Sequence, residues 1–426
     1  KDPPIVFKFI HTADIHLDSP LHRLEYYEGA PREEIRQASR RAFENLIDLA
    51  LDESVDFVLI AGDLFDGDWK DYHTGLYFIA QVQRLHAAGI TVFIVSGNHD
   101  AAGRMTRSLP YPENVHVFAH RQPETQTLDH LKIAVHGQSF AAPAVMDNLA
   151  RGYPEPVPGH FNIGLLHTSL TGREGHAPYA PCTLTDLESR GYDYWALGHV
   201  HQFEQVSRNP LAIFPGCLQG RNIRETGAKG SVLVVVEDRQ APEIIPWPHD
   251  VVRWDKLIVE LDHDATRQTG LDAFRKRLEA LLAQHDPLPV AVRVVFTGDT
   301  AAHARISGDR DYWQEAVRST AVAHFGDRAW IESVRVDTRP TNRGPTGPAD
   351  PGPLRELDRL VAEIEADEDK LLALGAALSP LLRKMPVEYR QGDRALAVED
   401  PECWRKMVRQ AHDLLIQGLK TEAPEA

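Results

Sequence analysis

The sequence has few cysteines and no long apolar run. Its three cysteines, Cys182, Cys217 and Cys403, are odd in number and widely spaced, which fits neither a disulfide framework nor a zinc motif. No apolar stretch is long enough to cross a bilayer, and we expect no secretory signal at the start of the chain. The sequence therefore predicts a protein of the reducing cytoplasm that does not enter a membrane.

The sequence also has no excess of basic residues over acidic ones. The chain carries 46 lysines and arginines against 62 aspartates and glutamates, which gives a net charge of −16. A protein that grips DNA over a broad basic surface is not expected from this balance. Metal ions in a cleft would supply strong local positive charge, so the acidic composition does not exclude a nuclease.

The length of 426 residues is too great for one typical core, and four segments are expected. Residues 1–250 form the first domain, and residues 251–337 follow a β-α-β-α-β order that predicts a small α+β domain. Residues 338–353 are rich in Pro, Gly, Asn and Asp and are predicted to be a linker. Residues 354–426 are predicted to be helical.

Apolar residues recur at helical spacing in that last segment. They are Leu357, Leu360, Val361 and Ile364 in a first helix, and Trp404, Val408, Ala411 and Leu415 in a last one. Helices tethered beyond a complete core either pack back on it or present their apolar face to a partner.

Five apolar strands each end in side chains suited to metal binding or proton transfer. These residues are Asp14 and His16, then Asp63, then Asn98, His99 and Asp100, then His167, and finally His199 and His201. Each motif alone is more often a turn, a surface pair or a structural histidine. Because strand carboxyl ends meet at one edge of an α/β sheet, five such motifs in one chain favour a shared metal site.

These motifs resemble the signature of the calcineurin-like metallophosphoesterases. Within them the chain is similar to the SbcD nucleases, bacterial relatives of the Mre nucleases, and especially to the YhaO-type branch. The stretches 11–20, 179–184 and 215–227 carry the branch likeness, which is strong over residues 5–250 and weak beyond. The resemblance implies an α/β fold, a four-layer α/β/β/α sandwich with a small α+β capping domain over the metal cleft.

Two further expectations concern the first domain. The apolar segments 211–214 and 231–236 are expected to be strands of the second sheet. Residues 141–160 are rich in Pro and Gly and are expected to form a surface loop.

By resemblance, seven ligands hold two divalent metal ions. The first metal is assigned Asp14, His16, Asp63 and His201, and the second Asp63, Asn98, His167 and His199. Asp63 is the shared ligand, because a carboxylate has two oxygens to offer. Manganese is the expected metal, with iron, zinc and magnesium as alternatives.

The remaining polar residues have proposed roles in proton transfer. His99 is expected to protonate the leaving 3′-oxygen or to stabilise charge on the phosphate, and Asp100 to orient His99 or its neighbours. Mre nucleases of archaea and eukaryotes have a histidine where Asp66 stands, whereas bacterial SbcD-like sequences resemble this chain. Contributions of Asp66 and of the nearby His73 to catalysis are left open.

The function expected from the resemblance is a two-metal DNA exonuclease or endonuclease in DNA repair. Its partner would be an SbcC-like coiled-coil ATPase that docks on residues 354–426 and holds the DNA, and a homodimer is also left open. The alternative is a phosphodiesterase or phosphatase on small nucleotides or other phosphoesters, which the catalytic signature does not separate from a nuclease. The capping domain and the helical segment favour the nuclease.

Overall fold

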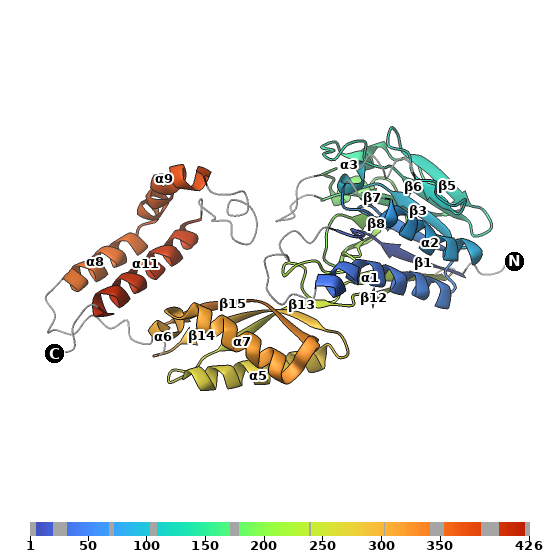
Figure 1. Cartoon of the computed structure of the whole chain (residues 1–426). Coiled ribbons are helices and arrows are strands. Elements are labelled where there is room, and N and C mark those ends of the chain that lie inside the picture. The colour runs from blue at the N-terminus through green and yellow to red at the C-terminus, as the bar shows by residue number, and fades with distance from the viewer. Residues whose placement is uncertain are drawn as a thin grey trace. The chain divides into compact units, whose positions relative to one another are not determined.

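The computed structural model divides the chain into two compact units (Figure 1). It describes residues 6–19, 32–67, 72–102, 109–170, 179–237, 240–301, 303–340, 353–384 and 400–421. One unit comprises Lys1–Ile258, Phe274–Val295 and Ala316–Arg335, and the other comprises Val259–Ala273, Phe296–Glu315 and Val336–Ala426. No helix among the described residues is long and apolar enough to cross a membrane.

The first sheet has six strands. In order across the sheet they are β12 (Glu243–Pro248), β11 (Gly230–Glu237), β1 (Val6–Thr12), β2 (Phe57–Ala61), β3 (Thr91–Val95) and β4 (Val115–Val117). Strands β1 to β4 are parallel, and β11 pairs antiparallel with β1. The expectation that 231–236 belongs to the second sheet is therefore wrong, since its run of valines predicts a strand but not the partner of that strand.

The second sheet also has six strands. In order they are β5 (Glu124–Leu128), β6 (Ile133–Gly137), β7 (Phe161–His167), β8 (Tyr194–Gly198), β10 (Leu211–Phe214) and β9 (Glu204–Arg208). Strands β6, β7, β8 and β10 are parallel, and the edge strands β5 and β9 are antiparallel. Strand β10 lies in this sheet, as the sequence predicted.

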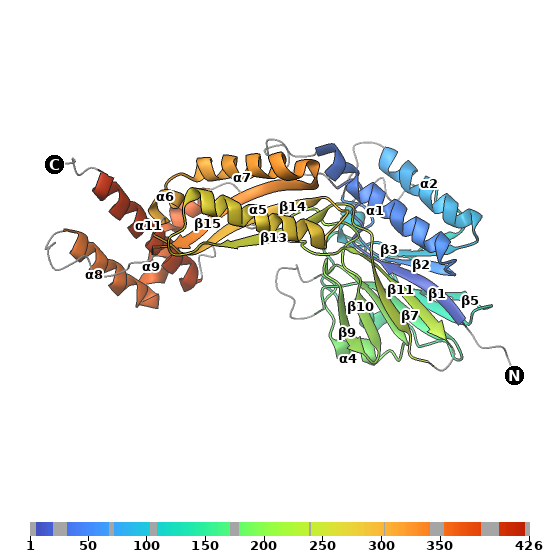
Figure 2. The same cartoon turned by 90° about the horizontal axis from the view of Figure 1, so that it is seen from below.

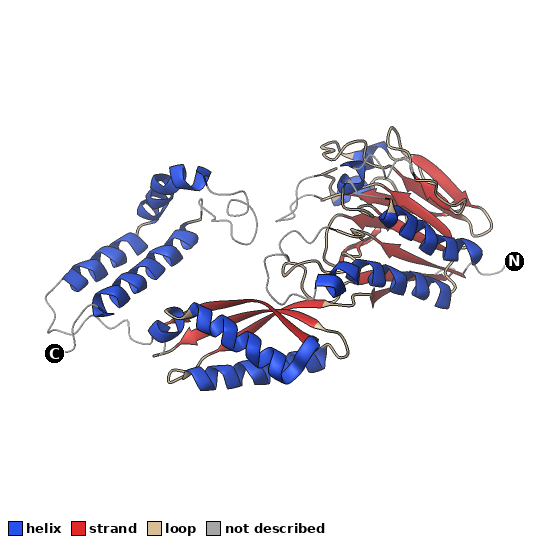
Figure 3. Cartoon of the chain, viewed as in Figure 1, coloured by secondary structure: helices blue, strands red, loops and turns tan. Residues whose placement is uncertain are grey.

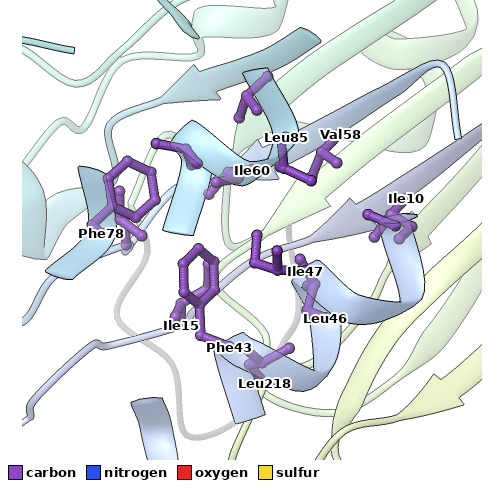
Figure 4. Packing of buried hydrophobic residues seen from close by; sticks show 14 of the residues in the cluster. Ile10, Ile15, Phe43, Leu46, Ile47, Val58, Ile60, Phe78, Leu85 and Leu218 are labelled. Atoms are coloured by element: carbon purple, nitrogen blue, oxygen red, sulfur yellow. The ribbon is translucent and has the colours of Figure 1, made fainter. Parts of the chain in front are cut away.

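Alternating side chains of the first sheet fill two hydrophobic cores. Val58 and Ile60 pack against α1 (Arg32–Asp52) and α2 (His73–Ala87) (Figure 4). Leu59 instead belongs to the core between the sheets. Figure 2 shows the resulting layers, with the helices over the first sheet and the second sheet beneath it. Since both faces are covered, these strands are continuous apolar runs.

The outer face of the second sheet has a thinner cover. It consists of the short helices η3 (Leu149–Gly152) and α4 (Leu184–Glu188) with adjoining loops. Tyr153 is buried there and its hydroxyl donates to the Leu165 carbonyl over 2.7 Å. The prediction of a surface loop over residues 141–160 is thus wrong around η3, where the chain forms a short helix and buries Ala150 and Tyr153. The four-layer sandwich itself is confirmed.

A three-stranded sheet follows (Figure 3). Its strands are β13 (Arg253–Glu260), β14 (Val290–Asp299) and β15 (Ala329–Arg339), and its helices are α5 (Arg267–Gln284), α6 (His303–Ser307) and α7 (Arg310–Phe325). Because helices cross over from each strand to its neighbour, this is a parallel α/β layer rather than the expected α+β arrangement. Strand β15 includes Thr338 and Arg339 of the predicted linker, and residues 341–352 lie outside the described residues.

The described residues of the C-terminal segment include the helices α8 (Pro353–Glu365), α9 (Glu368–Lys384) and α11 (Pro401–Thr421). They pack on one another around Trp404, whose ring lies against Gly375. Trp404 is 1% exposed, so its predicted place on a partner-facing stripe is wrong. Helical spacing identifies an apolar face but does not tell whether a sister helix or another protein covers it. Leu360 and Leu415 of the predicted stripes do remain exposed.

Candidate metal centre

Strand ends from both sheets place the predicted ligands, and the backbone there is unusual. The φ angles are 49° at Asp14, 46° at His16, 51° at Asp63 and 103° at His199. Such left-handed backbone costs a non-glycine residue about 1–3 kcal/mol and concentrates at functional sites. We infer that the fold holds these residues in place for their side chains rather than for stability.

One group of ligand atoms comes from the ends of β1 and β8. The carboxylate and imidazole atoms of Asp14, His16 and His201 lie within 4.8 Å of one another. His201 Nε2 is 3.5 Å from Asp14 Oδ1 and 3.4 Å from His16 Nε2. Among the described residues, the buried Oδ1 of Asp14 has no hydrogen-bond partner. A buried carboxylate oxygen that faces two imidazoles fits a divalent cation.

Asp63 connects this group to a second one. Its Oδ2 is 3.9 Å from His16 Nε2 and 3.6 Å from His167 Nε2. His167 Nε2 is in turn 3.1 Å from Asn98 Oδ1, and the His167 and His199 rings are 5.2 Å apart. The structure thus brings all the predicted ligands together, with Asp63 between the two groups. Asp63 is 2% exposed and His199 is 8% exposed.

Glycines allow these close approaches. A Cβ atom on Gly97 would collide with the Asp63 carboxylate, and one on Gly62 would collide with the His167 ring. His167 Nδ1 donates to the Ala61 carbonyl over 2.9 Å, which fixes the ring and leaves Nε2 toward Asp63. Such a hydrogen bond is typical of histidines that bind metals.

The set of carboxylates, imidazoles and one amide, without a thiolate, fits a pair of divalent first-row or magnesium ions. Bound ions of this kind polarise a phosphoryl oxygen and lower the pKa of water. The protein itself supplies the fixed orientation of the ligands and their burial.

His99 lies beside this centre and is oriented by Asp66. Its Nδ1 is 2.5 Å from Asp66 Oδ1, and the Ser19 hydroxyl donates to the other oxygen of Asp66. Partial burial works to raise the pKa of Asp66, but the hydrogen bonds from His99 and Ser19 outweigh it and lower that pKa to about 2. Burial likewise works to lower the pKa of His99, but Asp66 and the charge of Asp63 raise it above its usual value. His99 is therefore suited to carry a proton on Nε2.

Two other predicted residues have different places. Asp100 is buried and accepts hydrogen bonds from the backbone N–H groups of Phe65 at 2.8 Å, Gly97 at 3.0 Å and Leu64 at 3.2 Å. It therefore joins the turns after β2 and β3, which favours the expectation that it orients the neighbours of His99 rather than the His99 ring. His73 is exposed at the start of α2.

Sequence reasoning gave no role to Arg221 and Glu225. Glu225 Oε1 lies 2.7 Å from Nδ1 of His201, and Arg221 Nη2 is 3.2 Å from the same oxygen. Burial works to raise the pKa of Glu225, but His201 and Arg221 lower it well below its usual range. The available signal was a pair of opposite charges four residues apart in the Gly-rich stretch 215–227.

Two protein families match the chain. Residues 7–203 match the family described as calcineurin-like phosphoesterase, and residues 254–339 match that described as metallophosphoesterase YhaO, middle domain. The Bacillus subtilis (strain 168) protein named "Uncharacterized metallophosphoesterase YhaO" is 34% identical over 360 residues, which cover 82% of this chain and 87% of that protein.

More distant likenesses cover less of the chain. The DNA double-strand break repair protein Mre11 of Methanopyrus kandleri is 27% identical over 49% of this chain and 48% of its own length. A solved dimetal phosphatase from Danio rerio covers 57% of this chain and 99% of its own at 13% identity, with a TM-score of 0.32. Together with the extended match to YhaO, the site geometry identifies a metal-dependent phosphoesterase. The chain belongs to the calcineurin-like metallophosphoesterases, and within them to the YhaO type.

Proposed function

We propose that this metallophosphoesterase hydrolyses phosphodiester bonds of DNA. The observation that carries the proposal is the contact between Asp66 and Nδ1 of His99, 2.5 Å long, next to the predicted ligands. It leaves Nε2 of His99 to protonate a leaving oxygen. A sugar 3′-oxygen is a poor leaving group without a proton, so a positioned acid suits a nucleic acid diester.

The likeness to Mre11 proteins adds support from a distance. They are named for DNA double-strand break repair, and this chain spans about half the length of the Mre11 relatives it matches. Carboxylate and imidazole ligands without a thiolate suit manganese, iron or zinc. Manganese is the proposed metal, because the nucleases that the chain resembles prefer it.

The experiment compares three substrates: labelled duplex DNA, labelled single-stranded DNA and bis(p-nitrophenyl) phosphate. Each is incubated with Mn²⁺, with EDTA, and with an Asp63→Ala variant in Mn²⁺. We expect Mn²⁺-dependent cleavage of DNA and of the chromogenic diester, and none in the two controls. Cleavage of the chromogenic diester alone would favour the alternative, a phosphodiesterase or phosphatase that acts on small substrates. No cleavage of any diester would contradict the proposal.

We also propose that the C-terminal helices bind a coiled-coil ATPase that holds the DNA. Leu360, Leu381 and Leu415 are 49%, 61% and 53% exposed on the three helices. Large apolar side chains exposed on each of these helices favour an interaction with a partner. A net charge of −16 also fits a subunit that leaves DNA binding to a partner.

A matched pair of variants tests this partner. Leu381→Glu should abolish co-purification with a co-expressed SbcC-like ATPase and leave hydrolysis of the chromogenic diester unchanged. Leu76→Glu, on α2 and 56% exposed, should leave both unchanged. Equal co-purification of the two variants with the ATPase would contradict the docking role of the helices.

A further inference from the structure

The loop 215–227, between β10 and β11, carries a partly buried cation, Arg221, next to the metal centre. Arg221 Nη2 is 3.2 Å from Glu225 Oε1, and its Nη1 is 3.7 Å from Asp66 Oδ2. Nη1 also donates to the Ser19 hydroxyl over 3.4 Å. The two ends of one guanidinium thus face two carboxylates, Asp66 in the segment after β2 and Glu225 in the same loop as Arg221.

Each of those carboxylates orients a different histidine of the site. Asp66 contacts Nδ1 of His99 at 2.5 Å, and Glu225 contacts Nδ1 of His201 at 2.7 Å. His99 is the acid of the proposed reaction, and His201 is a predicted metal ligand. A continuous series of polar contacts therefore runs from the acid through Arg221 to the metal centre.

We infer that Arg221 is a positioning residue that couples the orientation of His99 to that of His201 by bridging Asp66 and Glu225. For His99 this inference rests on the proposed function, because it takes that residue as the acid. For His201 it rests on the ligand geometry alone.

Hydrogen bonds and apolar packing fix the loop backbone around Arg221. The backbone N–H of Arg221 donates to Glu225 Oε2 over 2.6 Å, so the carboxylate is held from the backbone as well as from the guanidinium. The preceding carbonyl of Gly220 accepts from Trp254 Nε1 over 2.9 Å. Ile223 is 3% exposed and packs in a hydrophobic cluster with Trp254. Because the backbone on both sides of Arg221 is held in place, its side chain loses less conformational entropy when it bridges two partners.

The role requires the shape of arginine and not only its charge. A guanidinium presents separate N–H donors at fixed directions, whereas a lysine ammonium is a single point. A lysine at 221 would keep the positive charge near the metals but would not reach Asp66 and Glu225 together. Arg221→Lys therefore separates positioning from electrostatics.

The experiment measures two properties of the full chain. One is the Mn²⁺ dissociation constant, obtained by calorimetry without substrate. The other is the ratio of kcat for methyl p-nitrophenyl phosphate to kcat for methyl phenyl phosphate, since the phenol is the poorer leaving group and depends more on an acid. Arg224→Lys is the matched control, because Arg224 is exposed in the same loop.

Arg221→Lys should weaken Mn²⁺ binding about 10-fold or more and raise the kcat ratio about 10-fold, the usual scale for losing an outer-shell partner. Asp66→Asn should change the kcat ratio more than Mn²⁺ binding, and Glu225→Gln should change Mn²⁺ binding more than the kcat ratio, because Arg221 transmits part of each loss to the other histidine. Arg224→Lys should behave as the wild type in both. Thermal unfolding of each variant verifies that it is folded. If Arg221→Lys is unstable, Asp66→Asn tests the contact with His99 and Glu225→Gln tests the contact with His201.

Wild-type values of both properties in a folded Arg221→Lys variant would overturn the inference, since charge alone would then suffice. So would unchanged properties in both Asp66→Asn and Glu225→Gln. If the wild type hydrolyses neither these diesters nor DNA, the proposed function fails, while the Mn²⁺ measurement still decides whether Arg221 and Glu225 position His201.

Discussion

The backbone N–H of His99 donates to Oδ1 of Asp63 over 2.9 Å. This hydrogen bond joins the proposed acid to the ligand that lies between the two groups of metal-binding atoms. It requires the turn after β3 to pass directly against the turn after β2, which the missing side chain of Gly97 permits. Metal binding and proton transfer therefore depend on the same contact between two strand ends.

Removal of the proposed acid should separate catalysis from metal binding. His99→Ala should keep its metal content and lose about 10²–10⁴-fold in kcat on DNA, because Asn98 and not His99 is the predicted ligand. Metal analysis and initial rates measure the two effects. His86→Ala, which removes an exposed histidine of α2, is the control and should match the wild type. Loss of metal from His99→Ala would make His99 a ligand instead.

A methyl group at Gly97 should damage the centre. In Gly97→Ala the new Cβ would collide with the Asp63 carboxylate and displace it. We expect Mn²⁺ affinity to fall by about 10- to 100-fold, as for other lost supports of a ligand. Calorimetric titration measures it against Gly152→Ala, where the added Cβ would meet only Pro123, at 4.0 Å. Equal affinity of the two variants would show that the turn can relax.

The helical C-terminal segment should depend on Trp404 for its own stability. Trp404→Ala removes a ring that is 1% exposed and packed against Gly375, at a cost of about 3–5 kcal/mol to those helices. Hydrogen exchange in α9 and α11 should rise strongly, while hydrolysis of the chromogenic diester should persist. Leu415→Ala, at a 53% exposed position, should leave exchange unchanged. Unaltered protection in Trp404→Ala would contradict this packing.

One buried histidine outside the metal centre should make the fold sensitive to acid. Burial lowers the pKa of His249 from 6.5 to about 4, and its ring lies 2.8 Å from the Ser231 hydroxyl. Between those two values the unfolded chain binds more protons than the folded one. The contribution of His249 to the free energy of unfolding is therefore complete above pH 6.5 and is lost, by on the order of 3 kcal/mol, as the pH drops to about 4.

Urea unfolding in EDTA across this pH range measures the effect. His249→Asn should flatten the fall in stability, while His86→Asn should retain it, because His86 is exposed. The same slope for His249→Asn and the wild type would show that other groups cause the acid sensitivity.

The predicted ligands came together because their positions follow from local signals. A strand followed by Gly and Asp, as at Gly62 and Asp63, places a carboxylate at the carboxyl edge of a sheet wherever that strand pairs. The parallel strands β1 and β7, one in each sheet, then bring Asp14 and His167, which follow or end them, near one another. Local pattern and strand order are sufficient for this part of the structure.

Local sequence patterns do not predict which strands pair over long distances or which loop residues contact the site. The segment 231–236 has the same apolar pattern in either sheet, and only its pairing with β1 decides between them. Glu225 lies 24 residues beyond His201 in a loop without periodicity, so nothing local indicates that the two side chains meet. Helical spacing likewise placed Trp404 on an apolar face but did not show that α9 covers it.

Counting and locating metals tests the central claim most directly. Anomalous diffraction from crystals soaked in Mn²⁺, recorded for the wild type and for Asp63→Ala, reports both number and position. The account predicts two manganese peaks on either side of Asp63 in the wild type, one near His16 and His201 and the other near His167. It predicts that Asp63→Ala loses both. A single peak, no peak, or a wild-type pair retained in Asp63→Ala would contradict a two-metal centre shared through Asp63.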